Sequence, residues 1–105
     1  MNEELKKRID ELVHGHRVVL FMKGSPLMPM CGFSASAVQT LREAGATDVA
    51  SVNVLEDPEI RQGIKDYSNW PTIPQIFIDG KFVGGCDILR DLHERGELEG
   101  MLKGS

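Results

Sequence analysis

Hydrophobic positions at the start of the chain change from helical spacing to an unbroken apolar run. Apolar residues recur at helical intervals between residues 5 and 13 and predict an amphipathic helix that ends near Gly15. The all-apolar segment 18–22 is typical of a strand buried on both faces. Residues 23–30 contain two prolines and a glycine, so they are expected to form a loop.

Helical spacing returns in the middle of the chain. It predicts a second helix that begins at Gly32 and is stopped by Gly45. A second strand is expected over residues 51–55. The run Asp-Pro-Glu at 57–59 predicts a helix start, because it offers an N-cap, a first-turn proline and an acid facing the helix dipole. That third helix is expected to reach Tyr67.

The last third of the chain begins with a hairpin pattern. Residues 75–83 are two apolar runs joined by Asp-Gly. A helix is expected after two glycines, closing near Gly96 or continuing past it to Leu102. The order αβαβαββα, with a possible extra C-terminal helix, predicts an α/β fold. Its four-stranded sheet would be mixed and flanked by helices, within a single domain spanning 1–105.

Composition narrows the function classes. The chain has 105 residues and a formal net charge of −4, which favours no nucleic-acid partner. Its longest apolar run is far too short to span a bilayer. The charged N-terminal segment is unlike a signal or transit peptide, so we expect an intracellular chain or one already trimmed. Cys31 and Cys86 are too few for a disulfide scaffold, and their spacing matches no zinc motif.

Cys31 is the strongest candidate for chemistry. It follows the predicted loop and begins the predicted second helix, where unpaired N–H groups and the helix dipole stabilise a thiolate. Gly32 allows another molecule to approach the backbone closely, and Lys23 could add a cation. The alternative is that Cys31 is a small buried hydrophobe, as intracellular cysteines often are. The loop, the glycine and the helix start favour a functional thiol.

Four motifs, in order and at matching spacing, carry a resemblance that covers nearly the whole chain. They are Cys-Gly-Phe-Ser at 31–34, Phe-Met-Lys-Gly at 21–24, Trp-Pro-Thr-Ile-Pro-Gln at 70–75 and Gly-Gly-Cys-Asp-Ile at 84–88. Together they resemble the monothiol glutaredoxins, which implies a thioredoxin-like fold. Residues 53–58 and 61–69 are most similar to mitochondrial members. The resemblance therefore implies a mature mitochondrial matrix form, with a bacterial cytoplasmic or plastid protein as the alternative.

Ser34 separates two functions within this resemblance. A serine cannot resolve a mixed disulfide between Cys31 and glutathione, so oxidoreductase activity is expected to be weak. A thiolate remains a good ligand for iron, and a [2Fe–2S] cluster needs four ligands. The family pattern implies that Cys31 from each of two subunits and two glutathiones supply them, in a cluster carrier. The alternative is an oxidoreductase that removes glutathione from proteins.

The resemblance also implies a glutathione site. Lys23 and Arg61 would meet the glycine carboxylate, and the Ile73 backbone would pair with the cysteinyl part. Cys86 and Asp87 would meet the γ-glutamyl end. Pro74 is expected to be cis, and Ile73 replaces a residue that is often aromatic in relatives. The predicted glutathione-binding set is Lys23, Cys31, Gly32, Phe33, Arg61, Ile73, Pro74, Cys86 and Asp87.

Several of these residues have simpler interpretations. Lys23 and Arg61 could be solvated charges, and Asp87 could only cap a helix. Cys86 could be structural, or could form a disulfide with Cys31 under oxidation. Packing roles are expected for Trp70 and Tyr67, and none of the three histidines has ligand spacing. Expected partners are a second copy in the cluster-bound state, a BolA-like protein, a cluster scaffold and recipient apo-proteins, without nucleic acid or membrane.

Overall fold

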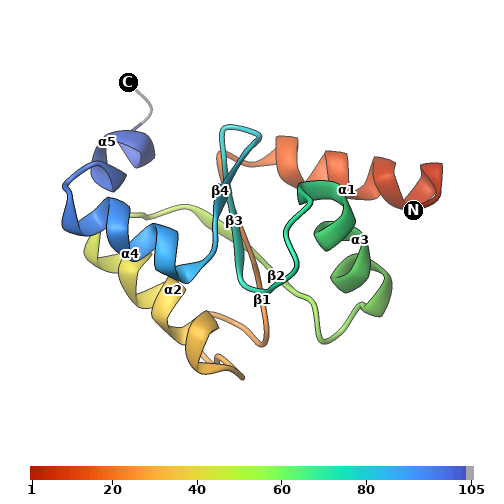
Figure 1. Ribbon diagram of the computed structural model, residues 1–105, viewed down its shortest axis with the longest axis horizontal. Coiled ribbons are helices and arrows are strands. Elements are labelled where there is room, and N and C mark those ends of the chain that lie inside the picture. Colours follow the sequence, from red (N-terminus) through yellow and green to blue (C-terminus); the bar gives the residue numbers. More distant parts are fainter. Residues whose placement is uncertain (104–105) are drawn as a thin grey trace.

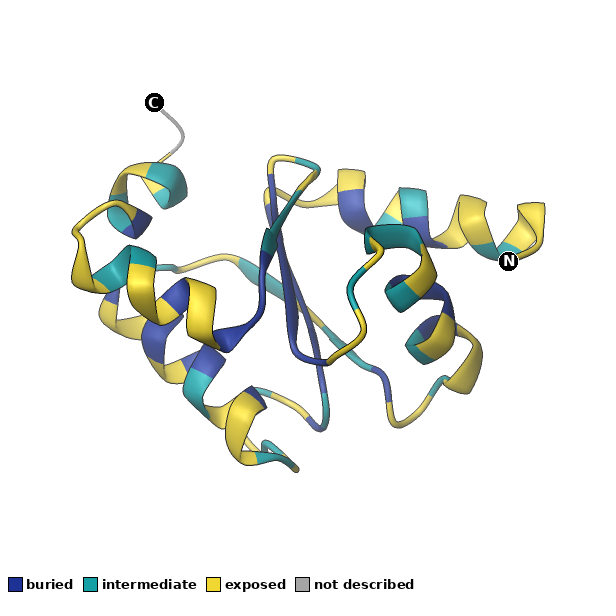
Figure 2. Ribbon diagram, viewed as in Figure 1, coloured by how far each residue is buried: buried dark blue, intermediate teal, exposed yellow. Residues whose placement is uncertain are grey.

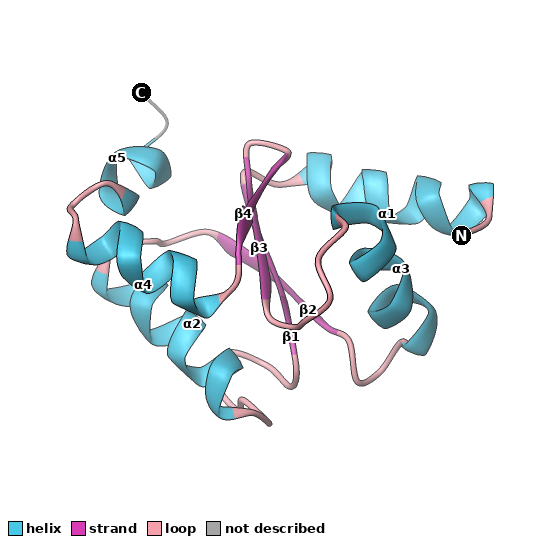
Figure 3. Ribbon diagram, viewed as in Figure 1, coloured by secondary structure: helices cyan, strands magenta, loops and turns pink. Residues whose placement is uncertain are grey.

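All the helices and strands expected from the hydrophobic pattern are present in the computed structural model, which describes residues 1–103 (Figures 1 and 3). The extra C-terminal helix is present too. The elements are α1 (Glu3–Gly15), β1 (Val18–Met22), α2 (Gly32–Glu43), β2 (Val49–Asn53), α3 (Pro58–Ser68), β3 (Gln75–Ile78), β4 (Lys81–Gly84), α4 (Cys86–Glu94) and α5 (Leu98–Lys103).

The four strands form one mixed sheet in the order β2-β1-β3-β4. β1 pairs with β2 in parallel, with Val18 opposite Val49, and β3 runs antiparallel to both β1 and β4. The first pair is parallel because α2 crosses over between its strands, whereas the Asp79-Gly80 turn makes the last pair a hairpin. The expected thioredoxin-like sheet is thus confirmed.

Two hydrophobic cores lie on opposite faces of this sheet. β1 divides between them, because Val18, Leu20 and Met22 point to one face and Val19 and Phe21 to the other. α2, α4 and α5 cover the first face, and α1 and α3 cover the second (Figure 1). Both faces of β1 are therefore buried, which explains its unbroken apolar sequence (Figure 2).

The second strand begins and ends two residues earlier than predicted. Val54 and Leu55 have strand-like side chains, yet they lie in a turn after β2. Asn53 ends the strand because its side-chain oxygen accepts the N–H of Leu55 at 3.0 Å and that of Gly24 at 2.9 Å. Val54 is nevertheless fully buried, so its hydrophobicity reflects the core and not the sheet.

α4 ends two residues before a glycine, Gly96. The helix stops at Glu94, and Gly96 has a φ of +72°, a left-handed conformation that favours glycine. The chain then turns and begins α5 as a separate helix. Of the two predicted ends of α4, closure near Gly96 is confirmed and continuation to Leu102 is wrong. No helix within residues 1–103 is both long enough and apolar enough to cross a bilayer.

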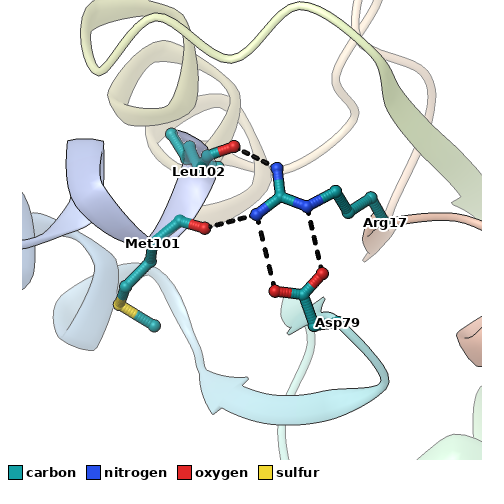
Figure 4. Close-up of polar contacts among 4 residues, drawn as sticks. All are labelled: Arg17, Asp79, Met101 and Leu102. Carbon is teal, nitrogen blue, oxygen red and sulfur yellow. Dashed lines mark hydrogen bonds and ion pairs between the residues drawn. The ribbon is translucent and has the colours of Figure 1, made fainter. Parts of the chain in front are cut away.

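Arg17 links the C-terminal helix to the sheet through hydrogen bonds (Figure 4). It directly precedes β1, so it lies at the other end of this strand from Cys31. Its Nε donates to the Asp79 carboxylate at 3.0 Å. Its Nη2 donates to the carbonyl oxygen of Met101 at 2.8 Å, and its Nη1 donates to that of Leu102. One guanidinium thereby binds the hairpin turn and carbonyls at the end of α5, which no helical N–H can reach.

Polar contacts also join α1 to α3 on the other side of the sheet. Asp57 caps α3 by accepting the Ile60 N–H at 3.2 Å, and it accepts a 2.6 Å hydrogen bond from Arg8. The Arg8 hydrogen bond is the main reason that the pKa of Asp57 is lowered. Tyr67 donates to Asp10 at 2.6 Å, and burial together with that carboxylate raises the pKa of Tyr67 to about 12. α3 is thus held in place beside the end of β1.

Candidate functional site: a thiolate beside a cation-lined pocket

Cys31 is the N-cap of α2, held there by a loop that closes on itself. The loop of residues 24–30 brings the chain back to the end of β1, where the N–H of Met30 donates to the Lys23 carbonyl at 2.9 Å. Gly24, with a φ of +90°, makes this return possible, because a Cβ there would lie 2.5 Å from the carbonyl oxygen of Met28. Cys31 therefore lies next to Lys23 in space.

The Cys31 sulfur lies near the backbone donors of the first helical turn, although its side chain forms no capping hydrogen bond. The thiol is half-buried, and Cys31 has extended backbone angles, φ −157° and ψ 138°. The N–H of Ser34 is the main cause of a lowered pKa of Cys31, with burial opposing it. The N–H of Phe33, the Lys23 charge and the Ser34 hydroxyl add smaller lowering effects. The expected thiolate at a helix start is thus supported by the site's geometry.

Ser34 is a structural part of this site as well as the position of the missing second thiol. The residue is fully buried, and its Oγ accepts the backbone N–H of Lys23 at 3.0 Å. Its hydroxyl hydrogen can then point to the Cys31 sulfur. Ser34 joins the end of β1 to the start of α2, so the serine has a role beyond a polar helix residue.

A pocket of about 570 Å³ opens beside Cys31. Its walls come from the end of β1, the start of α2, one face of α3, the segment before β3 and the start of α4. Of the predicted glutathione residues, Cys31 and Gly32 lie outside its lining, and the others form part of its wall. The lining residues are Lys23, Phe33, Arg61, Lys65, Trp70, Pro71, Thr72, Ile73, Pro74, Gly85, Cys86, Asp87 and Ile88.

Charges in the pocket are arranged asymmetrically. Lys23, Arg61 and Lys65 line it, and within residues 1–103 none of these three cations forms an ion pair. Asp87 lines it too, at the first turn of α4, and is 3.9 Å from Arg90. The pocket therefore suits a ligand that has a carboxylate for the cations and an amine for Asp87.

Sequence reasoning missed several residues of the pocket wall. Lys65 lies one turn after Arg61 on the same helix face, a spacing that could have placed it in the site. Trp70 was expected only to pack. Its ring does contact Phe82, with centroids 5.6 Å apart, but it also lines the pocket, and its buried Nε1–H has no partner in residues 1–103. Nothing in the local pattern distinguished that role.

The backbone of two loops meets behind the pocket. The Ile73–Pro74 peptide bond is cis, as expected. Gly85 packs against this segment so closely that a Cβ there would lie 3.3 Å from the Pro74 carbonyl oxygen and 3.6 Å from Trp70 Nε1. A glycine at 85 thus allows the start of α4 to approach the cis-proline loop.

The second cysteine has a different environment. Cys86 is buried, and burial is the main cause of a raised pKa of its thiol, followed by the Asp87 charge. Its Sγ donates to Asp87 Oδ1 at 3.8 Å. Both cysteines are free thiols in the structure, so a Cys31–Cys86 disulfide stays a prediction. Of the histidines, His93 forms a hydrogen bond with Glu99, in which Nδ1 and Oε1 are 2.6 Å apart.

The fold and the site together define a thiol protein: a mixed thioredoxin-like sheet that presents one cysteine with a lowered pKa beside a cation-lined pocket. The family model described as Glutaredoxin matches residues 18–83. The chain belongs to the glutaredoxin family.

Two relatives place the chain near the monothiol members. It is 57% identical over 93 residues to "Glutaredoxin-related protein 5, mitochondrial" of Danio rerio, covering 89% of this chain and 60% of that protein's length. It is 55% identical over 103 residues to "Uncharacterized monothiol glutaredoxin ycf64-like" of Synechocystis, covering 98% of this chain and 95% of that protein. Similar relatives thus include a mitochondrial and a cyanobacterial protein.

Solved structures agree with the fold. Reduced apo GrxS14 of poplar has a TM-score of 0.80 and 48% identity, over 94% of this chain and 90% of that one. A buckwheat glutaredoxin–glutathione complex has a TM-score of 0.83 and 26% identity, over 98% and 94% of the two chains. The buckwheat protein was thus solved with glutathione bound.

Proposed function

We propose that this chain is a monothiol glutaredoxin that binds glutathione and carries a labile [2Fe–2S] cluster bridged between two subunits, receiving and passing it on in iron–sulfur cluster assembly. The observation that carries the proposal is Cys31, a thiol with a lowered pKa at the start of α2, beside a cation-lined pocket and without a second thiol at Ser34. Such a sulfur can bind glutathione or iron but has no neighbour to release it.

Glutathione fits the pocket by charge and by backbone. Its glycine carboxylate would meet Lys23, Arg61 and Lys65, the three cations that line the pocket. Its cysteinyl part would pair with the backbone of Ile73, next to Pro74. The remaining contacts involve residues that flank the sulfur or begin α4. Gly32 and Phe33 would lie along the ligand's thiol end, and Cys86 and Asp87 would take the γ-glutamyl end.

The number of ligands favours a shared cluster. No group of three His, Cys, Asp or Glu side chains comes together anywhere in residues 1–103, so the described part of one chain does not enclose a metal. Cys31 from two subunits and two glutathione thiols give the four ligands that a [2Fe–2S] cluster needs. The cluster is cargo here, and a site completed by exchangeable tripeptides suits its release.

The surface around Cys31 favours a second subunit. Leu27 and Phe33 are 88% and 63% exposed, and Met28 and Met30 lie exposed between them. The segment that leads into α2 is thus mostly exposed (Figure 2). Apolar side chains gathered at a site are typical of protein–protein contacts. We extend the proposal to a homodimer in the cluster-bound state, and to a BolA-like protein, a cluster scaffold and recipient apo-proteins as partners.

Anaerobic reconstitution tests the carrier function. The protein is incubated with iron, sulfide and glutathione, and then analysed by visible absorption and size-exclusion chromatography. We expect a coloured dimer that contains two glutathiones and loses its colour when glutathione is removed. A colourless monomer that rapidly removes glutathione from protein thiols would overturn the carrier proposal and establish the oxidoreductase alternative.

The oxidoreductase alternative uses the same sulfur. The Cys31 thiolate would attack the glutathione sulfur of a mixed disulfide, releasing the protein thiolate and forming a Cys31–glutathione disulfide. A second glutathione thiolate must then release the first as glutathione disulfide, because Ser34 cannot. We therefore expect slow turnover that depends on glutathione concentration.

The relatives support two alternative compartments. The mitochondrial relative at 57% identity supports a mitochondrial matrix location, and the cyanobacterial relative at 55% supports the bacterial or plastid alternative. We propose the matrix, without contact with nucleic acid or membrane. Localisation of the tagged chain in its source cells tests this directly.

A further inference from the structure

Gln75 is a fully buried polar residue at the start of β3, directly after the cis-proline loop. Its side-chain Nε2 donates two hydrogen bonds of 3.1 Å, one to the carbonyl oxygen of Trp70 and one to that of Thr72. Both accepting residues line the pocket. One carboxamide therefore holds two points of the irregular segment that forms the pocket wall.

The hydrogen bonds fix the orientation of this carboxamide. Two carbonyl oxygens face Nε2, and rotating the group by 180° would place Oε1 against both of them. Oε1 itself is buried and has no partner in residues 1–103. An unpaired buried oxygen lowers the stability of the fold, so stability alone does not explain a glutamine at this position.

The direction of one N–H follows from these contacts. The Thr72–Ile73 peptide is trans, so its C=O and N–H point in opposite directions. Because the Thr72 carbonyl points toward the Gln75 side chain, the N–H of Ile73 points away from that side chain. Ile73 lines the pocket, and within residues 1–103 its N–H donates to no protein acceptor. A ligand can therefore accept it.

We infer that Gln75 is a positioning residue of the glutathione pocket. Its carboxamide holds the pocket wall so that the backbone N–H of Ile73 is presented to the ligand. This inference rests on the proposed function and deepens it, because the residue acts through the backbone and never touches glutathione. Pro71 and Pro74 have no N–H, so Thr72 and Ile73 supply the only backbone donors between Trp70 and Gln75, and the orientation of the Ile73 donor matters for binding.

Three variants test the inference. Gln75→Met keeps the length and removes the donors, whereas Gln75→Glu keeps the shape but sets acceptors against both carbonyls. Gln39→Glu makes the same charge change at an exposed position of α2. Glutathione affinity is measured through the fluorescence of Trp70, the single tryptophan. The rate of Cys31 alkylation by iodoacetamide and the ¹H–¹⁵N signal of Ile73 are measured on the same samples.

We expect Gln75→Met to weaken glutathione binding about tenfold, roughly the loss of one hydrogen bond, and Gln75→Glu to weaken it more. The Ile73 signal should move in both variants, while Cys31 alkylation and the control Gln39→Glu remain at the wild-type level. If Gln75→Glu does not fold, Gln75→Met decides alone.

Each other result has a distinct meaning. Unchanged affinity in the folded Gln75→Met protein would overturn the inference and leave the glutathione site intact. A parallel fall of affinity, alkylation rate and thermal stability would also overturn it, because the residue would then be only structural. Failure of the wild-type protein to bind glutathione would overturn the proposed function itself, and the positioning role with it.

Discussion

Two helices of this molecule have a cysteine at their start, and the pKa values of the two thiols are shifted in opposite directions. Cys31 is the N-cap of α2 and Cys86 is the first residue of α4, after Gly85. Both lie at the positive end of a helix dipole. Cys86 lines the pocket, whereas Cys31 lies outside its lining, two residues before the lining residue Phe33. The pKa of Cys31 is nevertheless lowered and that of Cys86 is raised.

The difference comes from what else surrounds each sulfur. As the N-cap, Cys31 has the N–H groups of Ser34 and Phe33 close enough to lower the pKa of its thiol, a cation nearby and partial access to solvent. Cys86 is 6% exposed and neighbours a carboxylate. Burial and a like charge disfavour a thiolate more than the dipole favours it. A helix start is therefore insufficient; the N-cap position and exposure decide.

Removing each sulfur in turn breaks this comparison most strongly. Cys31→Ser should abolish cluster assembly and nearly all alkylation at neutral pH while leaving the fold intact, because the reactive thiolate is gone. Cys86→Ser should retain both, because residue 86 would meet glutathione through its backbone N–H, which serine keeps. Visible absorption after reconstitution and mass spectrometry of alkylated peptides give the result. A cluster spectrum that persists in Cys31→Ser would refute the assignment of Cys31 as the ligand.

A second thiol at the start of α2 should change the outcome of the Cys31 chemistry. In Ser34→Cys the introduced thiolate can attack the Cys31–glutathione disulfide, form an internal disulfide and expel glutathione. Because that step is intramolecular, we expect deglutathionylation to accelerate on the order of tenfold. A coupled glutathione reductase assay measures it, with Ser36→Cys as the control at a neighbouring position of α2. Equal rates in wild type and Ser34→Cys would mean that release of glutathione is not limiting.

The fold could be predicted from the sequence because its strongest signals are local. The apolar run of β1, the Asp-Gly turn and the Asp57 cap each depend on neighbours in the chain. The bounds of β2 could not be found this way, since Asn53 ends the strand through contacts with Gly24 as well as with Leu55. A contact 29 residues away in sequence leaves no periodic trace.

The candidate site divides in the same way. Cys31 is marked by its loop, its glycine and its helix start, and Ser34 is marked by motif. The functions of Trp70 and Gln75 depend on three-dimensional contacts: a buried indole N–H beside Gly85, and a carboxamide between two carbonyls. In the sequence both residues belong to the motif at 70–75, but the motif does not say what their side chains contact, so those contacts come from the structure alone.

The hydroxyl at position 34 gives a smaller effect with two readouts. Ser34→Ala removes the acceptor of the Lys23 N–H, and leaving that N–H unpaired should lower the free energy of unfolding by about 1–3 kcal/mol. It also removes one cause of the lowered pKa of Cys31, so alkylation near neutral pH should slow about two- to fivefold. Urea unfolding and alkylation rates measure these effects. Ser36→Ala, which loses only an exposed contact with Arg90, is the control, and equal losses in both variants would contradict the role of Ser34.

The smallest expected effect concerns Cys86. Its raised pKa means that its thiolate forms at higher pH than that of Cys31, so the ratio of Cys31 to Cys86 alkylation should fall as pH rises above the pKa of Cys31. Asp87→Asn removes the neighbouring charge and replaces the carboxylate that accepts from the Cys86 thiol with a neutral amide oxygen, a weaker acceptor, which lowers the pKa of Cys86. Burial, the main cause, remains, so Cys86 alkylation should rise only about two- to threefold. Asp91→Asn, one turn further along α4 and paired with Arg95, should leave it unchanged. If Asp87→Asn slowed Cys86 alkylation, the charge at the start of α4 would not be what distinguishes the two helix ends.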